Sequence, residues 1–243
     1  MTRLMKKILA ALLIVLLVTP AWAAVTVDST NSGEGADPLS VSRTIAVGAT
    51  LDVLLCAADD ALAFVTGVTR STDTYTELTT ARASDGTTGI STTIFYKTNP
   101  LSGTANAVAA VSGSTEGLGC WGISFTGSDT STPFSGQTGV MDATADDATE
   151  SNSVTAVAGE IVIDVIGLRQ ETATGLTAGA SQTDIVSVEA TGQGHGYGGS
   201  WQAGADGGVM SWSWTTNMET AHSIAVVKAA GAASARRPII IVQ

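Results

Sequence analysis

Short segments of alternating apolar and polar residues are the feature that most limits how this chain can fold. After residue 24, no segment keeps apolar residues at the i, i+3, i+4, i+7 spacing of an amphipathic helix. Instead, alternation extends over runs of about five to nine residues that Gly, Asp, Asn, Ser and Thr clusters bound. Clear runs lie at 51–55, 161–168, 209–215 and 223–228. This pattern predicts an all-β chain, an antiparallel β-sandwich or jelly roll of about 10 to 12 strands.

The same order of segments occurs twice, which indicates an internal duplication. Residues 51–55 resemble 161–165 at an offset of 110 positions, and residues 122–125 resemble 223–226 at an offset of 101. Three further pairs lie between them in the same order: 67–69 with 175–177, 95–96 with 200–201, and 107–111 with 210–214. We expect half-repeats over about 48–127 and 159–228. Because one such half offers only one apolar face, the two are expected to form a single sandwich.

Residues 128–153 separate these halves and are rich in Ser, Thr, Gly and acidic residues. This composition predicts an acidic linker or a long surface loop. The acidic side chains, together with Asp59 and Asp60, also carry the hard oxygen ligands that calcium prefers, although no EF-hand loop pattern is present. We expect no cofactor, with calcium as the alternative. The candidate calcium ligands within residues 128–153 are Asp142, Asp146, Asp147 and Glu150.

Residues 1–23 have the three parts of a secretory signal peptide. Arg3, Lys6 and Lys7 are the positive region, 8–18 is an unbroken apolar stretch, and Ala21-Trp22-Ala23 is the cleavage motif. The alternative is an uncleaved anchor, but the apolar stretch is shorter than the roughly 20 residues that a membrane span needs. We therefore expect a β-sandwich body over 24–228, a C-terminal extension over 229–243, and no stable membrane span once the signal is removed.

The acidic charge of the chain argues against a nucleic-acid partner. The chain has 11 Lys and Arg against 22 Asp and Glu, a net charge of −11, and charged residues make up only 14% of it. A general nucleic-acid binder needs basic residues to neutralise phosphates, so that function is not expected. Three of the cations belong to the signal peptide, and Arg236 and Arg237 lie in the extension. The exported body is therefore strongly acidic, and we expect a secreted or cell-surface protein, with the periplasm as the alternative.

Three motifs resemble a pattern of Thr- and Gly-rich β-sandwich proteins of phage virions or tails and of bacterial surfaces. They are Gly48-x-x-Leu51-x-Val53-x-Leu55, the segment 68–76, and the segment 122–127. The resemblance covers about 40–230 and contains no catalytic signature. It implies a structural or binding role. A signal peptide departs from ordinary phage tail proteins, which favours the surface or secreted members of this group.

The two cysteines occupy matching places in two predicted strands. If strands 51–57 and 119–126 pair antiparallel, Cys56 lies opposite Cys120, Val53 opposite Ile123 and Leu51 opposite Phe125. An exported protein is the expected setting for a disulfide between such residues. Two separate buried thiols are the alternative.

A Gly-rich segment, 192–199, contains His195 and a formal G-x-G-x-x-G match at Gly194, Gly196 and Gly199. Dinucleotide binding needs a helix after this motif, whereas a strand-like segment follows it here, so no such site is predicted. Neither G-x-S-x-G nor H-E-x-x-H occurs, and we expect no enzyme. The segment suggests instead a flexible Gly-rich loop beside a glycan-stacking surface made by Tyr197, Trp201 and His195.

Three large residues, Met210, Trp212 and Trp214, alternate with polar residues, and we predict that they fill the core. In the alternative, one of the two tryptophans belongs to the glycan-stacking surface. The extension ends in Ile239, Ile240, Ile241 and Val242, which favour a strand. This strand either returns to its own sheet or adds to the sheet edge of a neighbour, and we hypothesise the second. The sequence therefore predicts an exported non-enzymatic protein with a structural, adhesion or particle-assembly role, with a carbohydrate-binding module as the alternative.

Overall fold

The described part of the chain forms four antiparallel sheets. The computed structural model describes residues 24–35, 38–59, 65–84, 89–112, 117–144, 147–169, 174–188 and 195–231. The predicted signal peptide and residues 232–243 lie outside these ranges. The described residues form strands and two short 3-10 turns, Thr79–Ala81 and Gly204–Asp206, which confirms the all-β prediction. None of them forms a helix long and apolar enough to cross a bilayer.

The first half of the chain builds two sheets. The first inner sheet has the order β1-β9-β3-β7-β6, and the first outer sheet has the order β2-β8-β4-β5. The strands of the first inner sheet are β1 Thr26–Gly35, β9 Leu118–Thr126, β3 Leu51–Ala58, β7 Ser91–Thr98 and β6 Thr76–Glu77. Those of the first outer sheet are β2 Leu39–Ile45, β8 Gly103–Val111, β4 Val65–Arg70 and β5 Asp73–Thr74.

The second half repeats this arrangement. The second inner sheet has the order β10-β17-β12-β15-β14, and the second outer sheet has the order β11-β16-β13. The strands of the second inner sheet are β10 Phe134–Asp142, β17 Glu219–Val227, β12 Ile161–Arg169, β15 His195–Ala203 and β14 Thr183–Val188. Those of the second outer sheet are β11 Thr149–Ser153, β16 Val209–Ser213 and β13 Thr177–Ala178.

Both halves follow one strand order, as a duplicated unit would. Strand β3 corresponds to β12, β9 to β17, β7 to β15 and β8 to β16, and each occupies the same place in its sheet. Every pair of sequence segments matched above falls on such equivalent strands or, for 175–177, at the start of one. The turns before β3 and β12 also match, because each contains a glycine, Gly48 or Gly159, at φ 93°.

The predicted acidic linker over 128–153 is wrong. Residues 134–142 and 149–153 form β10 and β11, the counterparts of β1 and β2, so the repeats begin near residues 26 and 134. Both strands lie at sheet edges and carry Ser, Gly, Thr and acidic residues without a strong apolar alternation. These strands and several of only two residues raise the number of described strands to 17, above the expected range.

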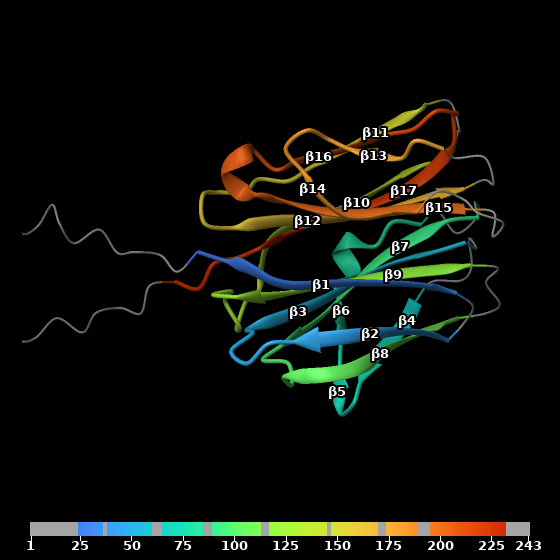
Figure 1. Ribbon diagram of the computed structural model, residues 1–243. Helices are drawn as coiled ribbons and strands as arrows, with labels where there is room; N and C mark the ends of the chain where they lie inside the picture. The colour runs from blue at the N-terminus through green and yellow to red at the C-terminus, as the bar shows by residue number, and fades with distance from the viewer. Residues whose placement is uncertain are drawn as a thin grey trace, which may run out of the picture.

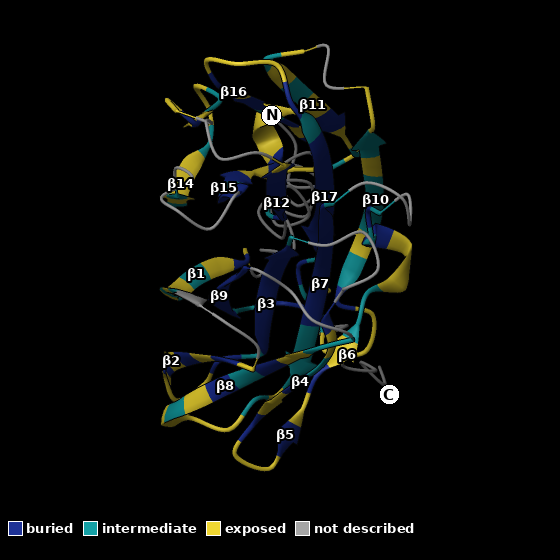
Figure 2. Cartoon of the chain, turned by 90° about the vertical axis from the view of Figure 1, so that its right-hand side faces the viewer, coloured by how far each residue is buried: buried dark blue, intermediate teal, exposed yellow. Residues whose placement is uncertain are grey.

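The sheets stack in four layers (Figure 1), so the two inner sheets form a central sandwich with one outer sheet on each side. The largest apolar core lies between the two inner sheets and includes Val53, Ile123, Ile163 and Ala225. Each half has a further core between its own inner and outer sheet. The central strands are therefore buried on both faces, and Figure 2 shows them as the dark interior of the molecule. Residues 51–55 and 161–168, where alternation is predicted, are therefore apolar at most positions of both faces.

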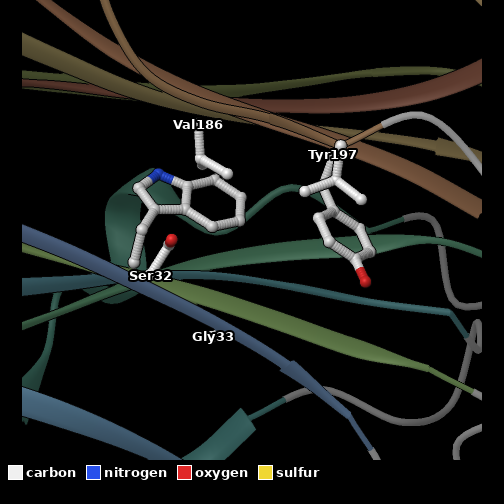
Figure 3. A pocket seen from close by; sticks show the side chains of 6 residues that line it. Ser32, Gly33, Val186 and Tyr197 are labelled. Atoms are coloured by element: carbon white, nitrogen blue, oxygen red, sulfur yellow. The ribbon is translucent and has the colours of Figure 1, made fainter.

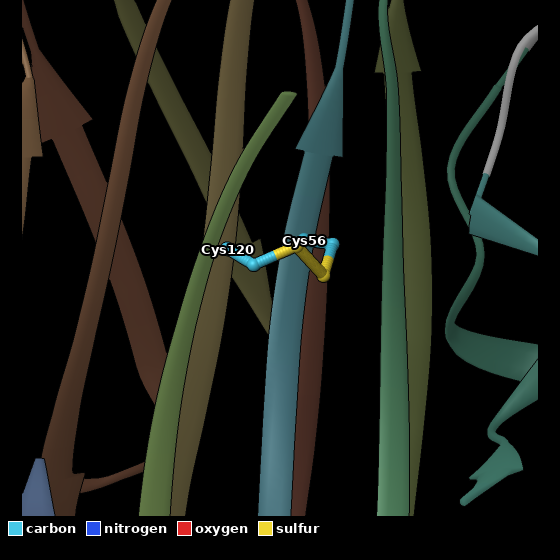
Figure 4. The surroundings of a disulfide bond; sticks show 2 residues. All are labelled: Cys56 and Cys120. Carbon is cyan, nitrogen blue, oxygen red and sulfur yellow. A yellow bond between two sulfur atoms is a disulfide. The ribbon is translucent and has the colours of Figure 1, made fainter. Parts of the chain in front are cut away.

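The disulfide and its register agree with the sequence prediction. Strands β3 and β9 pair antiparallel with Cys56 opposite Cys120, Val53 opposite Ile123 and Leu51 opposite Phe125. The two sulfurs are bonded (Figure 4), and they belong to the core between the first inner and outer sheets. In the chain-entropy view, closing a loop of 64 residues stabilises the fold by about 4 kcal/mol.

Candidate functional site

Strand β15 brings the three predicted glycan contacts to one face. His195, Tyr197 and Trp201 occupy alternate positions of a strand, so their side chains all point toward the first inner sheet. The prediction of a flexible Gly-rich loop is wrong for 195–199, which belong to β15, whereas 192–194 lie outside the described residues. No described helix follows the G-x-G-x-x-G match.

Two of these glycines are required by tryptophans on opposite sides of β15. A Cβ at Gly199 would lie 1.6 Å from Nε1 of Trp121, which comes from the first inner sheet. A Cβ at Gly198 would lie 2.6 Å from the ring of Trp212, which comes from the second outer sheet. The glycines therefore allow two large rings to pack directly on the backbone. Their role is to allow close packing. A single sequence does not distinguish such glycines from the glycines of a loop.

The first hollow, here called the aromatic cleft, lies between the edges of the two inner sheets (Figure 3). Its volume is about 260 Å³. The rings of Trp121 and Tyr197 lie 6.1 Å apart with an angle of 24° between their planes. Trp121 is buried, and within the part of the chain that the structure describes its Nε1 has no hydrogen-bond partner. The cleft is lined by Ser32, Gly33, Trp121, Val186, Val188 and Tyr197.

His195 extends the row of rings but is not a surface residue. Its ring lies 5.0 Å from that of Tyr197, and its side chain is completely buried against Gly117. Nδ1 of His195 lies 3.2 Å from Oδ2 of Asp59, and Nε2 has no hydrogen-bond partner among the described residues. A carboxylate on Nδ1 fixes the orientation of an imidazole. This imidazole therefore lies in the seam between the halves, where it joins the start of β15 to Asp59 and Gly117 of the first half.

The second hollow, here called the terminal groove, has a volume of about 580 Å³ and lies where β1 begins. Trp201 is the one aromatic residue among its described lining residues, so the structure places Trp201 and Tyr197 in separate hollows. Ala24 is the first residue after the predicted cleavage site, and Val25 donates its backbone N–H to the carbonyl of Gly159. The groove is lined by Ala24, Val25, Thr26, Val27, Gly159, Glu160, Ile161, Trp201 and Ala203.

Met210, Trp212 and Trp214 are all buried, which confirms the core interpretation. None of the three lines either hollow, so no ring of this group contributes to the predicted glycan surface. The indole N–H of Trp212 donates to Oδ2 of Asp164 at 2.7 Å. Besides Trp201 in the terminal groove, Trp121 lines the aromatic cleft, and the sequence analysis missed it. The available signal was its position beside Cys120, since alternation places it on the opposite face, toward the other half.

Asp164 is the centre of a buried polar cluster. Nε2 of His222 lies 2.9 Å from its Oδ2, while both the backbone N–H and the hydroxyl of Ser200 donate to its Oδ1, at 2.9 and 2.7 Å. This is not a nucleophile–base pair, because the carboxylate lies between the hydroxyl and the imidazole. The arrangement satisfies buried donors and supports no proton transfer from Ser200 to His222.

The residues considered for calcium do not converge in the described part of the structure. Asp60 and Asp146 lie outside that part. Oδ1 of Asp142 accepts hydrogen bonds from Thr144, and Glu150 accepts from the hydroxyl of Thr220. Among the residues with described positions, no three His, Cys, Asp or Glu side chains form a group that would hold a metal ion.

Comparison with known proteins found no match to a family model, to a curated protein or to a solved structure.

Proposed function

We propose that the chain is an exported, non-enzymatic protein with a structural role at a cell surface or in a particle, and that copies of it self-assemble. The observation that carries this proposal is that both histidine side chains form their contacts inside the protein, away from solvent. Both histidines are completely buried beside carboxylates, His195 at Asp59 and His222 at Asp164. The disulfide between central strands suits an oxidising compartment, and the signal-peptide pattern of residues 1–23 agrees with it.

Self-assembly rests on the C-terminal extension, which ends in four consecutive apolar β-branched residues. The test is the solution mass of the mature protein, residues 24–243, compared with a chain that ends at residue 235. The full chain is expected to form an oligomer and the truncated chain a monomer. Equal masses would disprove self-assembly through the extension, and a mature N-terminus other than Ala24 would argue against export by the predicted route.

The alternative function is carbohydrate binding, and the aromatic cleft is the observation that favours it. Aromatic faces beside a hydroxyl suit a sugar ring, and the cleft offers the rings of Trp121 and Tyr197 and the hydroxyl of Ser32. A glycan array on the mature protein tests this alternative. Because Ser32 is exposed, Ser32→Trp would fill the cleft without removing a core contact, and a hit that survives this substitution would exclude the cleft.

A further inference from the structure

The terminal groove is an apolar hollow beside the point where the described chain ends. The backbone N–H of Ala230 donates to the carbonyl of Gly127. Gly127 in turn touches the start of β1, since a Cβ on it would lie 2.6 Å from the carbonyl oxygen of Ala24. The walls of the groove include Val25, Val27, Ile161 and the partly exposed Trp201. The extension therefore leaves the body at the rim of this groove.

Charge also favours contact between the extension and the body. Residues 24–231 contain six Lys and Arg against 22 Asp and Glu. All six cations have partners within the body: Arg43, Arg82, Lys97, Arg169 and Lys228 form ion pairs, and Arg70 donates to two backbone carbonyls. Arg236 and Arg237 are the remaining Lys or Arg residues of the mature chain, and only Pro238 separates them from the apolar residues.

Acidic residues lie close to the groove along the chain. Glu160 lines it, and its Oε2 accepts a hydrogen bond from the backbone N–H of Val157. Asp206, which is exposed, follows the β15 wall by three residues. An apolar segment preceded by two cations therefore matches an apolar groove with carboxylates in its lining and in the chain that follows it. Its four apolar residues are β-branched, which suits an extended segment laid beside the strand β1.

We infer that the terminal groove of one copy binds residues 238–242 of a second copy. Seven residues, 232–238, separate Gly231 from Ile239, so the eight steps of an extended spacer carry the apolar segment up to about 26 Å away from its own groove. Pro238 favours an extended Arg237, which works against a tight reversal just before the segment. This inference rests on the proposed self-assembly and names the surface that receives the extension.

The first experiment blocks the groove in the mature full-length protein. Ala203 is exposed and lines the groove, so Ala203→Phe should fill it without removing a core side chain. The matched control is Ala180→Phe, at an exposed position in the turn between β13 and β14. By light scattering, Ala203→Phe is expected to reduce the oligomer to the mass of one copy, whereas Ala180→Phe keeps the mass of the unchanged protein.

The second experiment adds a synthetic peptide of residues 232–243 to the chain that ends at residue 235. Trp201 is the one described tryptophan that is not buried, so its emission should shift to shorter wavelength as the peptide binds. Binding should be at least about tenfold weaker for Ala203→Phe, a loss of about 1.4 kcal/mol. A peptide with Ser at 239–242 should not bind.

The outcomes separate this inference from the proposed function. If truncation yields a monomer but Ala203→Phe still assembles and the peptide leaves Trp201 unchanged, the groove is not the receiving surface, although self-assembly stands. If truncation leaves the mass of the full chain unchanged, self-assembly and the inference both fail. Peptide binding to the truncated chain, with a full-length protein that is monomeric, would show that the extension occupies its own groove and would overturn the exchange between copies.

Discussion

Asp52 and Asp164 are fully buried carboxylates on the two equivalent central strands, and the chain compensates them in different ways. Asp52 accepts hydrogen bonds from the guanidinium of Arg43 and the hydroxyl of Tyr75. Burial raises the pKa of Asp52, and the guanidinium of Arg43 opposes that rise. Asp164 has instead the imidazole of His222 and neutral donors. In both halves, a buried carboxylate thus joins the inner sheet to groups on neighbouring strands.

Replacing Asp164 by Ala should strongly destabilise the second half. The substitution leaves the buried donors of Ser200 and Trp212 without an acceptor, and each unsatisfied donor costs about 1 to 3 kcal/mol. We expect the free energy of unfolding in urea to fall by more than about 3 kcal/mol. Asp206→Ala, at an exposed position, is the control and should change it by less than about 0.5 kcal/mol. A loss below about 1 kcal/mol for Asp164→Ala would contradict the role of this cluster.

Asp129 should make stability depend on pH in the acidic range. Hydrogen bonds from Ser131 and the ammonium of Lys228 lower the pKa of Asp129 below its usual 3.8. Because the folded pKa is the lower one, the ionised group stabilises the protein above pH 3.8, and this contribution is lost as the pH falls through the folded pKa. Asp129 is partly exposed, so the effect should be about 1 kcal/mol or less.

The comparison of unchanged protein with Asp129→Asn in urea tests this dependence. The variant should be less stable at about pH 6, and the difference should shrink toward pH 2. A difference that stays constant between these two values would mean that the charge of Asp129 does not contribute.

At the scale of one element, β15 contributes to both cores of the second half, as the neighbouring strands β12 and β17 do. Its odd-numbered residues face the first inner sheet, and its even-numbered residues face the second outer sheet. The strand is Gly-rich because rings from both sides need its backbone. Its glycines are therefore packing positions, although a single sequence gives them the composition of a loop.

Gly199→Ala should destabilise the seam between the halves. The added methyl group would overlap Trp121, and overpacking of this kind costs about 1 to 3 kcal/mol. Gly67→Ala in β4 is the matched control, because nothing lies within 4 Å of a Cβ there. Thermal unfolding of the two variants gives the measurement. If both keep the unfolding temperature of the unchanged protein, the close packing of Trp121 on β15 is not what stabilises the seam.

At the scale of the whole molecule, the two halves are joined through the faces of their inner sheets. Leu51, Val53, Ile123 and Phe125 of the first half meet Ile161, Ile163 and Val227 of the second, and all are buried. Each half therefore has a core between its own inner and outer sheets. The other face of its inner sheet is also apolar, and only the other half covers it. An exposed face of this kind promotes association.

The isolated first half, residues 24–132, should accordingly not behave as a stable monomer. We expect it to associate through the uncovered face of its inner sheet, with a mass in solution of at least two copies or with loss of solubility. The chain 24–235 is the control, because it keeps both halves together without residues 236–243. A monomeric half that unfolds cooperatively would show that the two halves are independent domains.

The sequence by itself determined the all-β class, the strands with strong alternation, their equivalence in the two halves and the pairing of Cys56 with Cys120. Those properties depend on local pattern and on register, which residues within one or two strands specify. It could not identify β10 and β11, because edge strands with polar faces have the composition of loops.

Only the tertiary structure decided the four layers and the division of the predicted glycan residues between two hollows. Tyr197 and Trp201 share one face of β15, so alternation alone groups them. Whether such residues are covered by other side chains or line a groove depends on the distant strand that lies opposite them. Strand β9 lies opposite Tyr197, and the start of β1 lies opposite Trp201. Burial of a second sheet face is a non-local property, because the segment that covers it lies far away in the chain.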